Sequence, residues 1–192
     1  MKKLIYGIAL FLAVTSFSSC GYNSMIALDE SVKSQWAQVE NVYQRRSDLI
    51  PNLVNTVKGY ANFEQETLTK VIEARAKASS VTVDPAKLTP ESIQQFQAAQ
   101  GQLSQSLGRL LVTVEKYPDL KANQNFLELQ SQLEGTENRI TTERMKFNDV
   151  TQQYNSKIRT FPNNLTASMF GFTAKGYFKA EAGTEKAPKV AF

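Results

Sequence analysis

The chain contains no histidine and a single cysteine, Cys20, among its 192 residues. Without histidine there is no imidazole to act as a general acid or base, to activate a nucleophile or to bind zinc. One cysteine excludes an intrachain disulfide. The sequence also lacks an aspartate-rich loop that would indicate a calcium or magnesium site. We therefore expect no catalytic residues, no metal site and no cofactor.

The chain also lacks a large excess of charge of either sign. The chain has 22 basic and 18 acidic residues, a formal charge of +4. Two of the lysines, Lys2 and Lys3, lie in an N-terminal segment that we expect to be removed, which leaves 20 against 18, or +2. Nucleic-acid binding relies on clustered Lys and Arg, so this small surplus does not indicate it. At 42% hydrophobic residues the chain is long enough for one domain with a core.

The N-terminal segment has the parts of a secretory signal peptide. Two lysines precede an apolar run of 11 residues from Leu4 to Val14, and small polar residues follow. A helix needs about 20 apolar residues to span a bilayer, so this run favours a removable signal over a permanent anchor. A short uncleaved anchor from Leu4 to about Tyr22 is the alternative, and it would require some thinning of the bilayer.

The end of this segment indicates lipid attachment. It reads Phe17-Ser18-Ser19-Cys20-Gly21, which resembles the lipobox of bacterial lipoproteins, with Phe17 in place of the usual small aliphatic residue. In such proteins the chain is cut before the cysteine, which then carries lipid. We therefore expect a signal peptide over residues 1–19 and a lipid on Cys20.

From Met25 onward, apolar residues recur at alternating steps of three and four, the pattern of a helix with one apolar stripe. The seven-residue step from Tyr43 through Ile50 to Val57 continues across Pro51. A chain that ended one helix at the proline would have no reason to keep this phase. We therefore predict one long helix to about residue 80 that bends near Pro51.

Two further long helices follow a loop that contains two prolines. Thr89 followed by Pro90 predicts the start of a helix over about 90–116. After a turn at YPDLKAN, where Asp119 is the expected cap, aromatic and aliphatic residues recur every seven positions from Phe126 to Phe161. This spacing predicts the third helix.

The remaining chain predicts a short helix that folds back, and then a flexible tail over residues 179–192. We therefore predict an all-α fold for residues 20–178: an antiparallel helical bundle of three long helices, the first kinked at a proline, plus a short C-terminal helix.

Four charged residues interrupt the apolar stripes: Arg46 and Glu64 in the first predicted helix, Glu137 and Arg144 in the third. They could bind a ligand or act in general-acid chemistry. We favour interhelical ion pairs that fix the register of the bundle, because a narrow stripe gives no sign of a pocket. We expect at least one contact between Glu137 or Glu64 and an arginine of the other helix.

A series of long motifs runs in order through residues 22–178. They are YNSMIALDESVKSQWAQVENVYQRRSDLIPNLVNTVKGYA, Glu64 with the later VIEAR, YPDLKANQNFLELQSQLEGTENRI, YNSKIRTFPNN, and FGF with YF after it. In these motifs the sequence resembles the LemA family of bacterial envelope proteins. The resemblance implies an antiparallel helical bundle held to a membrane by its N-terminus, and no established enzymatic activity. Many relatives have a longer apolar N-terminal span, which the lipobox-like Cys20 replaces here.

Two functions remain open at this point. The first is a scaffold, anchored by its N-terminal lipid on the periplasmic side of the cell envelope, that recruits or spaces other envelope proteins or associates with itself. The second is a hydrolase or glycan-processing enzyme that uses only carboxylates. The missing histidines, and the lack of an Asp or Glu pair outside ordinary helix patterning, favour the scaffold.

Overall fold

A computed structural model describes residues 2–60 and 63–180, with side chains from residue 21 onward. This part of the chain is helical and contains no strand. The helices are α1 (Lys2–Lys58), α2 (Gln65–Ser80), α3 (Pro90–Val114), α4 (Pro118–Lys121), α5 (Gln124–Arg159) and α6 (Asn163–Phe170).

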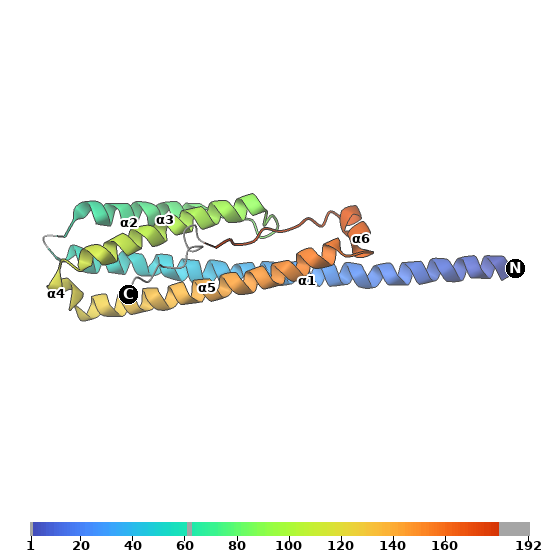
Figure 1. The fold of residues 1–192 in the computed structure, drawn as a ribbon, viewed down its shortest axis with the longest axis horizontal. Helices are drawn as coiled ribbons and strands as arrows, with labels where there is room; N and C mark the ends of the chain where they lie inside the picture. The colour runs from blue at the N-terminus through green and yellow to red at the C-terminus, as the bar shows by residue number, and fades with distance from the viewer. Residues whose placement is uncertain (1, 61–62, 181–192) are drawn as a thin grey trace, which may run out of the picture.

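The four long helices α1, α2, α3 and α5 form an up-and-down bundle, in which each runs antiparallel to the next (Figure 1). α1 packs chiefly on α5, and α2 packs chiefly on α3. The single turn of α4 joins α3 to α5 at one end of the bundle, which we call the α4 end. α6 lies across the opposite end, against α1 and α5, and we call this the α6 end. The predicted all-α class is therefore confirmed.

The prediction of three long helices is wrong, because the first one is divided. α1 ends at Lys58, and the chain reverses before α2 begins at Gln65. Past Gly59 the backbone tightens: the Tyr60 N–H donates to the Val57 carbonyl at 3.1 Å, and the Phe63 N–H to the Tyr60 carbonyl at 3.1 Å. Glycine in a helix costs about 1 kcal/mol relative to alanine, so Gly59 marks a weak point. An apolar period alone cannot distinguish one long helix from two that are joined by a tight turn.

α1 is continuous through Pro51, as predicted; the bend stays a prediction. Proline has no N–H, so the carbonyl of Ser47, four residues earlier, loses its helical partner. Arg75 of α2 replaces that partner, because its Nε donates to the Ser47 carbonyl at 2.8 Å. The hydroxyls of Ser47 and Ser79 also lie 3.1 Å apart. The neighbouring helix thus supplies the hydrogen bond that the proline removes.

The starts of α3 and α5 follow local capping rules. The Thr89 hydroxyl accepts a hydrogen bond from the Ser92 N–H at 3.2 Å, and Pro90 is the first residue of α3, as predicted. The cap of α5 is Asn123, whose side chain accepts from the Phe126 N–H at 3.1 Å. Asp119, the predicted cap, instead lies in the first turn of α4.

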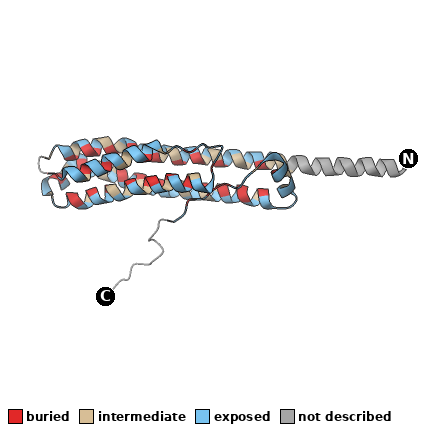
Figure 2. Cartoon of the chain, turned by 90° about the horizontal axis from the view of Figure 1, so that it is seen from above, coloured by how far each residue is buried: buried red, intermediate tan, exposed pale blue. Residues whose placement is uncertain are grey.

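Buried residues line the inward faces of the helices along the whole bundle (Figure 2). They form two apolar cores rather than one. The core near the α6 end includes Met25, Trp36, Phe96, Phe147 and Phe178. The core near the α4 end includes Ile50, Leu53, Leu68, Leu110 and Leu133.

After α6 the chain runs back along the bundle as an extended segment over residues 172–180, which we call the strap (Figure 1). Phe178 of the strap is buried, with its ring centroid 6.0 Å from that of Trp36 and 5.4 Å from that of Phe147. Lys179, the first residue of the predicted tail of residues 179–192, is hydrogen-bonded to Gln97, and the boundary of the tail stays a prediction. Residues 181–192 lie outside the described part of the chain.

The predicted signal peptide and Cys20 lie among residues whose side chains are not described. In the part of the chain that is described, no helix combines the length and apolar character that a membrane span requires.

Candidate functional site

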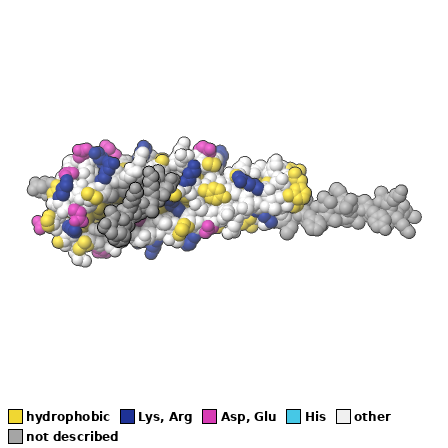
Figure 3. Space-filling view, in the orientation of Figure 1, with side chains coloured by type: hydrophobic (Ala, Val, Ile, Leu, Met, Phe, Trp, Pro, Cys, Tyr) yellow, Lys and Arg dark blue, Asp and Glu magenta, His cyan; other side chains and the backbone are white. Residues whose placement is uncertain are grey.

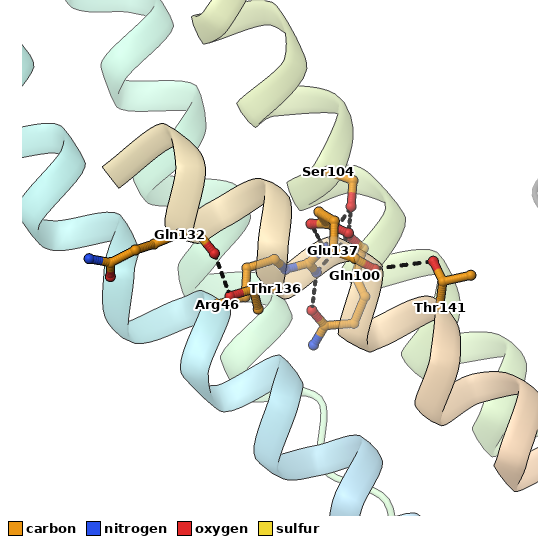
Figure 4. Close-up of polar contacts among 7 residues, drawn as sticks. All are labelled: Arg46, Gln100, Ser104, Gln132, Thr136, Glu137 and Thr141. Carbon is orange, nitrogen blue, oxygen red and sulfur yellow. Dashed lines mark hydrogen bonds and ion pairs between the residues drawn. The ribbon is translucent and has the colours of Figure 1, made fainter. Parts of the chain in front are cut away.

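Arg46 is the centre of a polar layer across the middle of the bundle (Figure 4). Its side chain is only 1% exposed. One terminal nitrogen donates to a Glu137 carboxylate oxygen at 2.6 Å and to the Ser104 hydroxyl at 2.7 Å. The other donates to the Gln100 side chain at 2.7 Å and to the Gln100 carbonyl at 3.2 Å. Gln100 in turn donates to the Ala78 carbonyl at 3.2 Å, so the layer links all four long helices.

The polar layer separates the two apolar cores. Tyr43 belongs to the core on one side and Ile50 to the core on the other, and Arg46 lies between them in α1. A buried guanidinium loses its hydration, and here four hydrogen bonds offset that cost. Any shift of α3 or α5 along the bundle would break them. The contact that we predicted between Glu137 and an arginine of the other helix is present as the Arg46–Glu137 ion pair; its role in fixing register stays a prediction.

The other two predicted charges lie elsewhere. Glu64 precedes α2 at the α4 end, where its carboxylate is 3.2 Å from the Lys116 ammonium. Arg144 donates to the Lys179 carbonyl at 2.8 Å, and its guanidinium lies 5.0 Å from the centre of the Phe178 ring. The hypothesis of one four-residue cluster is corrected, because the reversal after Gly59 removes Glu64 from the α1 stripe.

An open cleft of about 750 Å³ borders the polar layer between α3 and α5. Sequence reasoning gave no sign of it. Gly101 of α3 lies on its wall, where a Cβ atom would meet nothing within 4 Å. The residues that line the cleft include Gln94, Gln97, Gln100, Gly101 and Gln105 from α3, Glu137, Thr141 and Arg144 from α5, and Lys179 and Ala180 from the strap.

The cleft offers amides and guanidinium groups rather than a catalytic pair. Glu137 is the only acidic residue among the described residues that line it, and its carboxylate is bound to Arg46. Glycoside hydrolysis of the usual kind needs two carboxyl groups about 5–10 Å apart. Within the described ranges, no group of three or more acidic or cysteine side chains is placed to hold a metal ion. The geometry favours binding over chemistry.

Three side-chain amides hold the strap, each by two hydrogen bonds to the backbone of one residue. Asn155 accepts from the Lys175 N–H and donates to the Lys175 carbonyl, both at 2.9 Å. Asn148 does the same for Phe178, both at 2.9 Å. Gln97 of α3 accepts from the Lys179 N–H at 3.1 Å and donates to its carbonyl at 2.8 Å. Each amide thus takes the place of a neighbouring strand.

The spacing explains how a helix can bind an extended chain in this way. Asn148 and Asn155 are seven residues apart, which is about 10.5 Å along a helix. Lys175 and Phe178 are three residues apart, which is about 10 Å along an extended chain. The two repeats match, so amides on one face of α5 meet successive backbone groups of the strap. Asparagine is a poor helix former, and its recurrence at this step is the signal that sequence reasoning missed.

A largely buried ion pair fastens the strap near the α6 end. The Lys175 ammonium is 2.7 Å from the Asp29 carboxylate of α1 and 5.2 Å from the centre of the Tyr154 ring. Partial burial works to raise the pKa of Asp29, but hydrogen bonds and attraction from Lys175 and Lys33 hold that pKa below its ordinary value of 3.8. Burial raises the pKa of Tyr154 to about 12. The charges of Asp29 and Lys175 thus pair with each other and hold the strap.

Comparison with known proteins identifies relatives of this bundle. The model of the LemA family matches residues 35–192. Protein LemA of Metamycoplasma hominis is 27% identical over 158 residues, which cover 82% of this chain and 68% of the relative. Magnetosome protein MamQ 2 of Paramagnetospirillum magneticum is 25% identical over 179 residues, and MamQ of Magnetospirillum gryphiswaldense is 25% identical over 178 residues. Each match covers 82% of this chain but only 64% of the MamQ protein.

Proposed function

The chain belongs to the LemA family, and on that premise we propose that it is a membrane-anchored helical scaffold of the bacterial cell envelope, without catalytic chemistry. We propose further that a lipid on Cys20 anchors it on the periplasmic side. The names of its relatives, LemA and magnetosome protein MamQ, are not enzyme names. The carboxylate-based hydrolase finds no support in the cleft, where Glu137 is held by Arg46.

The observation that carries this proposal is the shape of the bundle. α1 runs the full length of the bundle (Figure 1). Its residues 21–58 alone span about 57 Å at 1.5 Å per residue. The residue proposed to carry lipid directly precedes this span. A rod of this length that is attached at one end can reach about 57 Å from the membrane surface, which suits a spacer or recruiting scaffold.

The cleft between α3 and α5 is the surface at which we propose that a partner protein binds. Its amide side chains are of the kind that already hold the strap. An extended segment of another envelope protein would find in Gln94, Gln105 and Thr141 further donors and acceptors of this type. Binding of an extended chain through backbone hydrogen bonds is a common mode of peptide recognition.

Anchoring is tested by Cys20→Ser. We expect the wild-type chain in the membrane fraction with incorporated labelled fatty acid, and the variant as an unprocessed precursor without label. Ser19→Ala, which keeps the cysteine, is the matched control and should behave as wild type. Equal labelling of wild type and C20S would refute the lipid anchor.

Partner binding is tested with a photo-crosslinking amino acid in intact cells. Placed at Gln105, inside the cleft, it should trap the same partner repeatedly, and Arg144→Ala should weaken that crosslink. Placed at Asn138, which is exposed on α5 outside the lining of the cleft, it should not trap that partner. Equal products from both positions would show that the cleft is not the binding surface.

A further inference from the structure

The α6 end carries a cluster of exposed apolar side chains. Leu165, Met169 and Phe170 of α6 are 62%, 79% and 59% exposed, and Phe161 just before α6 is 76% exposed. Hydrophobic side chains gather at this end of the bundle in the space-filling view (Figure 3). Single exposed apolar residues are ordinary on a protein surface, but four of them within ten residues form a patch that calls for a partner.

The patch lies directly beside the start of the bundle. The Tyr22 ring of α1 packs against Phe170 and Phe172, with centroids 4.8 and 5.8 Å apart. A Cβ atom on Gly21 would lie 2.5 Å from the side-chain oxygen of Asn163, so the first turn of α6 sits close against α1. Cys20 and the apolar run from Leu4 to Val14 precede these contacts in the sequence. The patch is therefore at the end of the rod from which the chain leads to its anchor.

The charge of this end is basic. Residues 150–180 contain no Asp or Glu, while Lys157 and Arg159 immediately precede the patch. The nearest carboxylates that the structure shows on α1, Asp29 and Glu30, are both paired with Lys33, at 2.8 and 2.7 Å. Exposed apolar side chains flanked by unopposed basic residues are the combination that binds the interface of an anionic lipid bilayer.

We propose that α6, with Phe161, lies in the headgroup region of the leaflet to which the chain is anchored, as a second contact with the lipid surface. This inference rests on the proposed membrane anchoring. A lipid on one residue tethers the rod but leaves its tilt free. A second contact, made by a helix that is fixed to α1 and α5, sets the angle at which the bundle stands on the membrane and thus where the cleft faces.

The test uses the full chain with Cys20→Ser, so that a single introduced cysteine can carry an environment-sensitive dye. Met169→Cys places the dye on the patch. Val112→Cys is the matched control, because Val112 is 70% exposed on α3 near the other end of the bundle. Each labelled protein is mixed with phosphatidylcholine vesicles that contain about one third phosphatidylglycerol, and with vesicles of phosphatidylcholine alone.

We expect the dye at 169 to shift to the blue and at least double in intensity with the anionic vesicles, and to be quenched by lipids that carry a nitroxide near the headgroup. The dye at 112 should do neither. Adding Leu165→Ser and Phe170→Ser should abolish the response at 169. An unchanged emission at 169 would overturn the proposal, and so would a shift that grows with protein concentration without vesicles, since it would make a second copy the occupant.

The two proposals fail separately. If Cys20 carries no lipid in cells but the dye at 169 still enters vesicles, the lipid anchor is wrong and the contact through α6 stands. If Cys20 is lipidated and the dye at 169 stays in water, the anchor stands and the second contact is wrong.

Discussion

Arg46 shows how one residue can serve the whole bundle. Its position in the apolar stripe of α1 marked it in the sequence as a residue with a partner across the interface. That Glu137 accepts from it could be anticipated from charge and phase. The contacts with Gln100 and Ser104 could not, because the sequence does not reveal that α3 approaches α1 at this level, nor that a cleft lies beside it.

We expect Glu137→Ala to lower the free energy of unfolding by about 1–3 kcal/mol, because it leaves a buried guanidinium with one partner fewer. Glu137 is itself partly exposed, so the full cost of breaking a buried pair does not apply. A double-mutant cycle of Glu137→Ala with Arg46→Met, measured by urea unfolding, should give a favourable interaction free energy between the two side chains. Glu73→Ala, an exposed glutamate of α2, should stay within about 0.5 kcal/mol of wild type. Zero coupling in the cycle would contradict the register role.

Gly176 of the strap is required by close approach rather than by backbone angle. A Cβ atom there would lie 2.7 Å from the Pro90 Cα and 2.9 Å from the Thr89 carbonyl oxygen, both backbone atoms. We expect Gly176→Ala to destabilise the protein by about 1–3 kcal/mol. Gly101→Ala is the opposite case, since its Cβ meets nothing and alanine favours the helix, so it should stabilise by up to about 1 kcal/mol. Thermal unfolding of the two variants distinguishes them, and an unchanged G176A would show that the strap is not tightly seated.

At the scale of elements, the sequence predicts what repeats locally and misses what depends on contacts distant in the chain. The start of α3 and the span of α5 follow from the Thr89 cap, Pro90 and the seven-residue period. The reversal after Gly59 cannot be predicted in this way, because the apolar face of α2 has the same phase that a continued α1 would have. The strap cannot be predicted either, because asparagines on a helix are typical of a solvent-exposed face, and the sequence does not show that an extended chain packs on them.

The helix through Pro51 gives a prediction that couples two elements. Arg75→Ala removes the donor to the Ser47 carbonyl, a buried position, and should cost about 1–2 kcal/mol. Pro51→Ala restores a backbone N–H that can bond the same carbonyl. The cost of Arg75→Ala should therefore shrink to a few tenths of a kcal/mol in the Pro51→Ala background. Equal costs in the two backgrounds, measured by urea unfolding, would mean that Arg75 acts through packing alone.

At the scale of the whole molecule, the polar layer divides the rod into two halves. The half near the α6 end contains the strap, Trp36 and the proposed lipid contact. Among the described residues, the half near the α4 end consists of helices and the turns that join them. In a close-packed apolar core, a change at one side chain affects its neighbours. The polar layer separates the two cores, so apolar packing is not continuous from one half to the other. The halves are therefore candidates for separate cooperative units.

We expect a core deletion in one half to loosen that half first. Phe178→Ala should raise native-state hydrogen exchange in residues 28–43 and 140–158, because these residues lose the strap and its aromatic contacts. Leu110→Ala, a fully buried residue of the other core, should raise exchange in residues 50–57 and 103–114 instead. Each deletion should cost about 2–5 kcal/mol overall, so the comparison is made at matched global stability, with a little urea added to the milder variant. Two identical exchange maps would show that the bundle opens as one unit, and the polar layer would then fix register without dividing the rod.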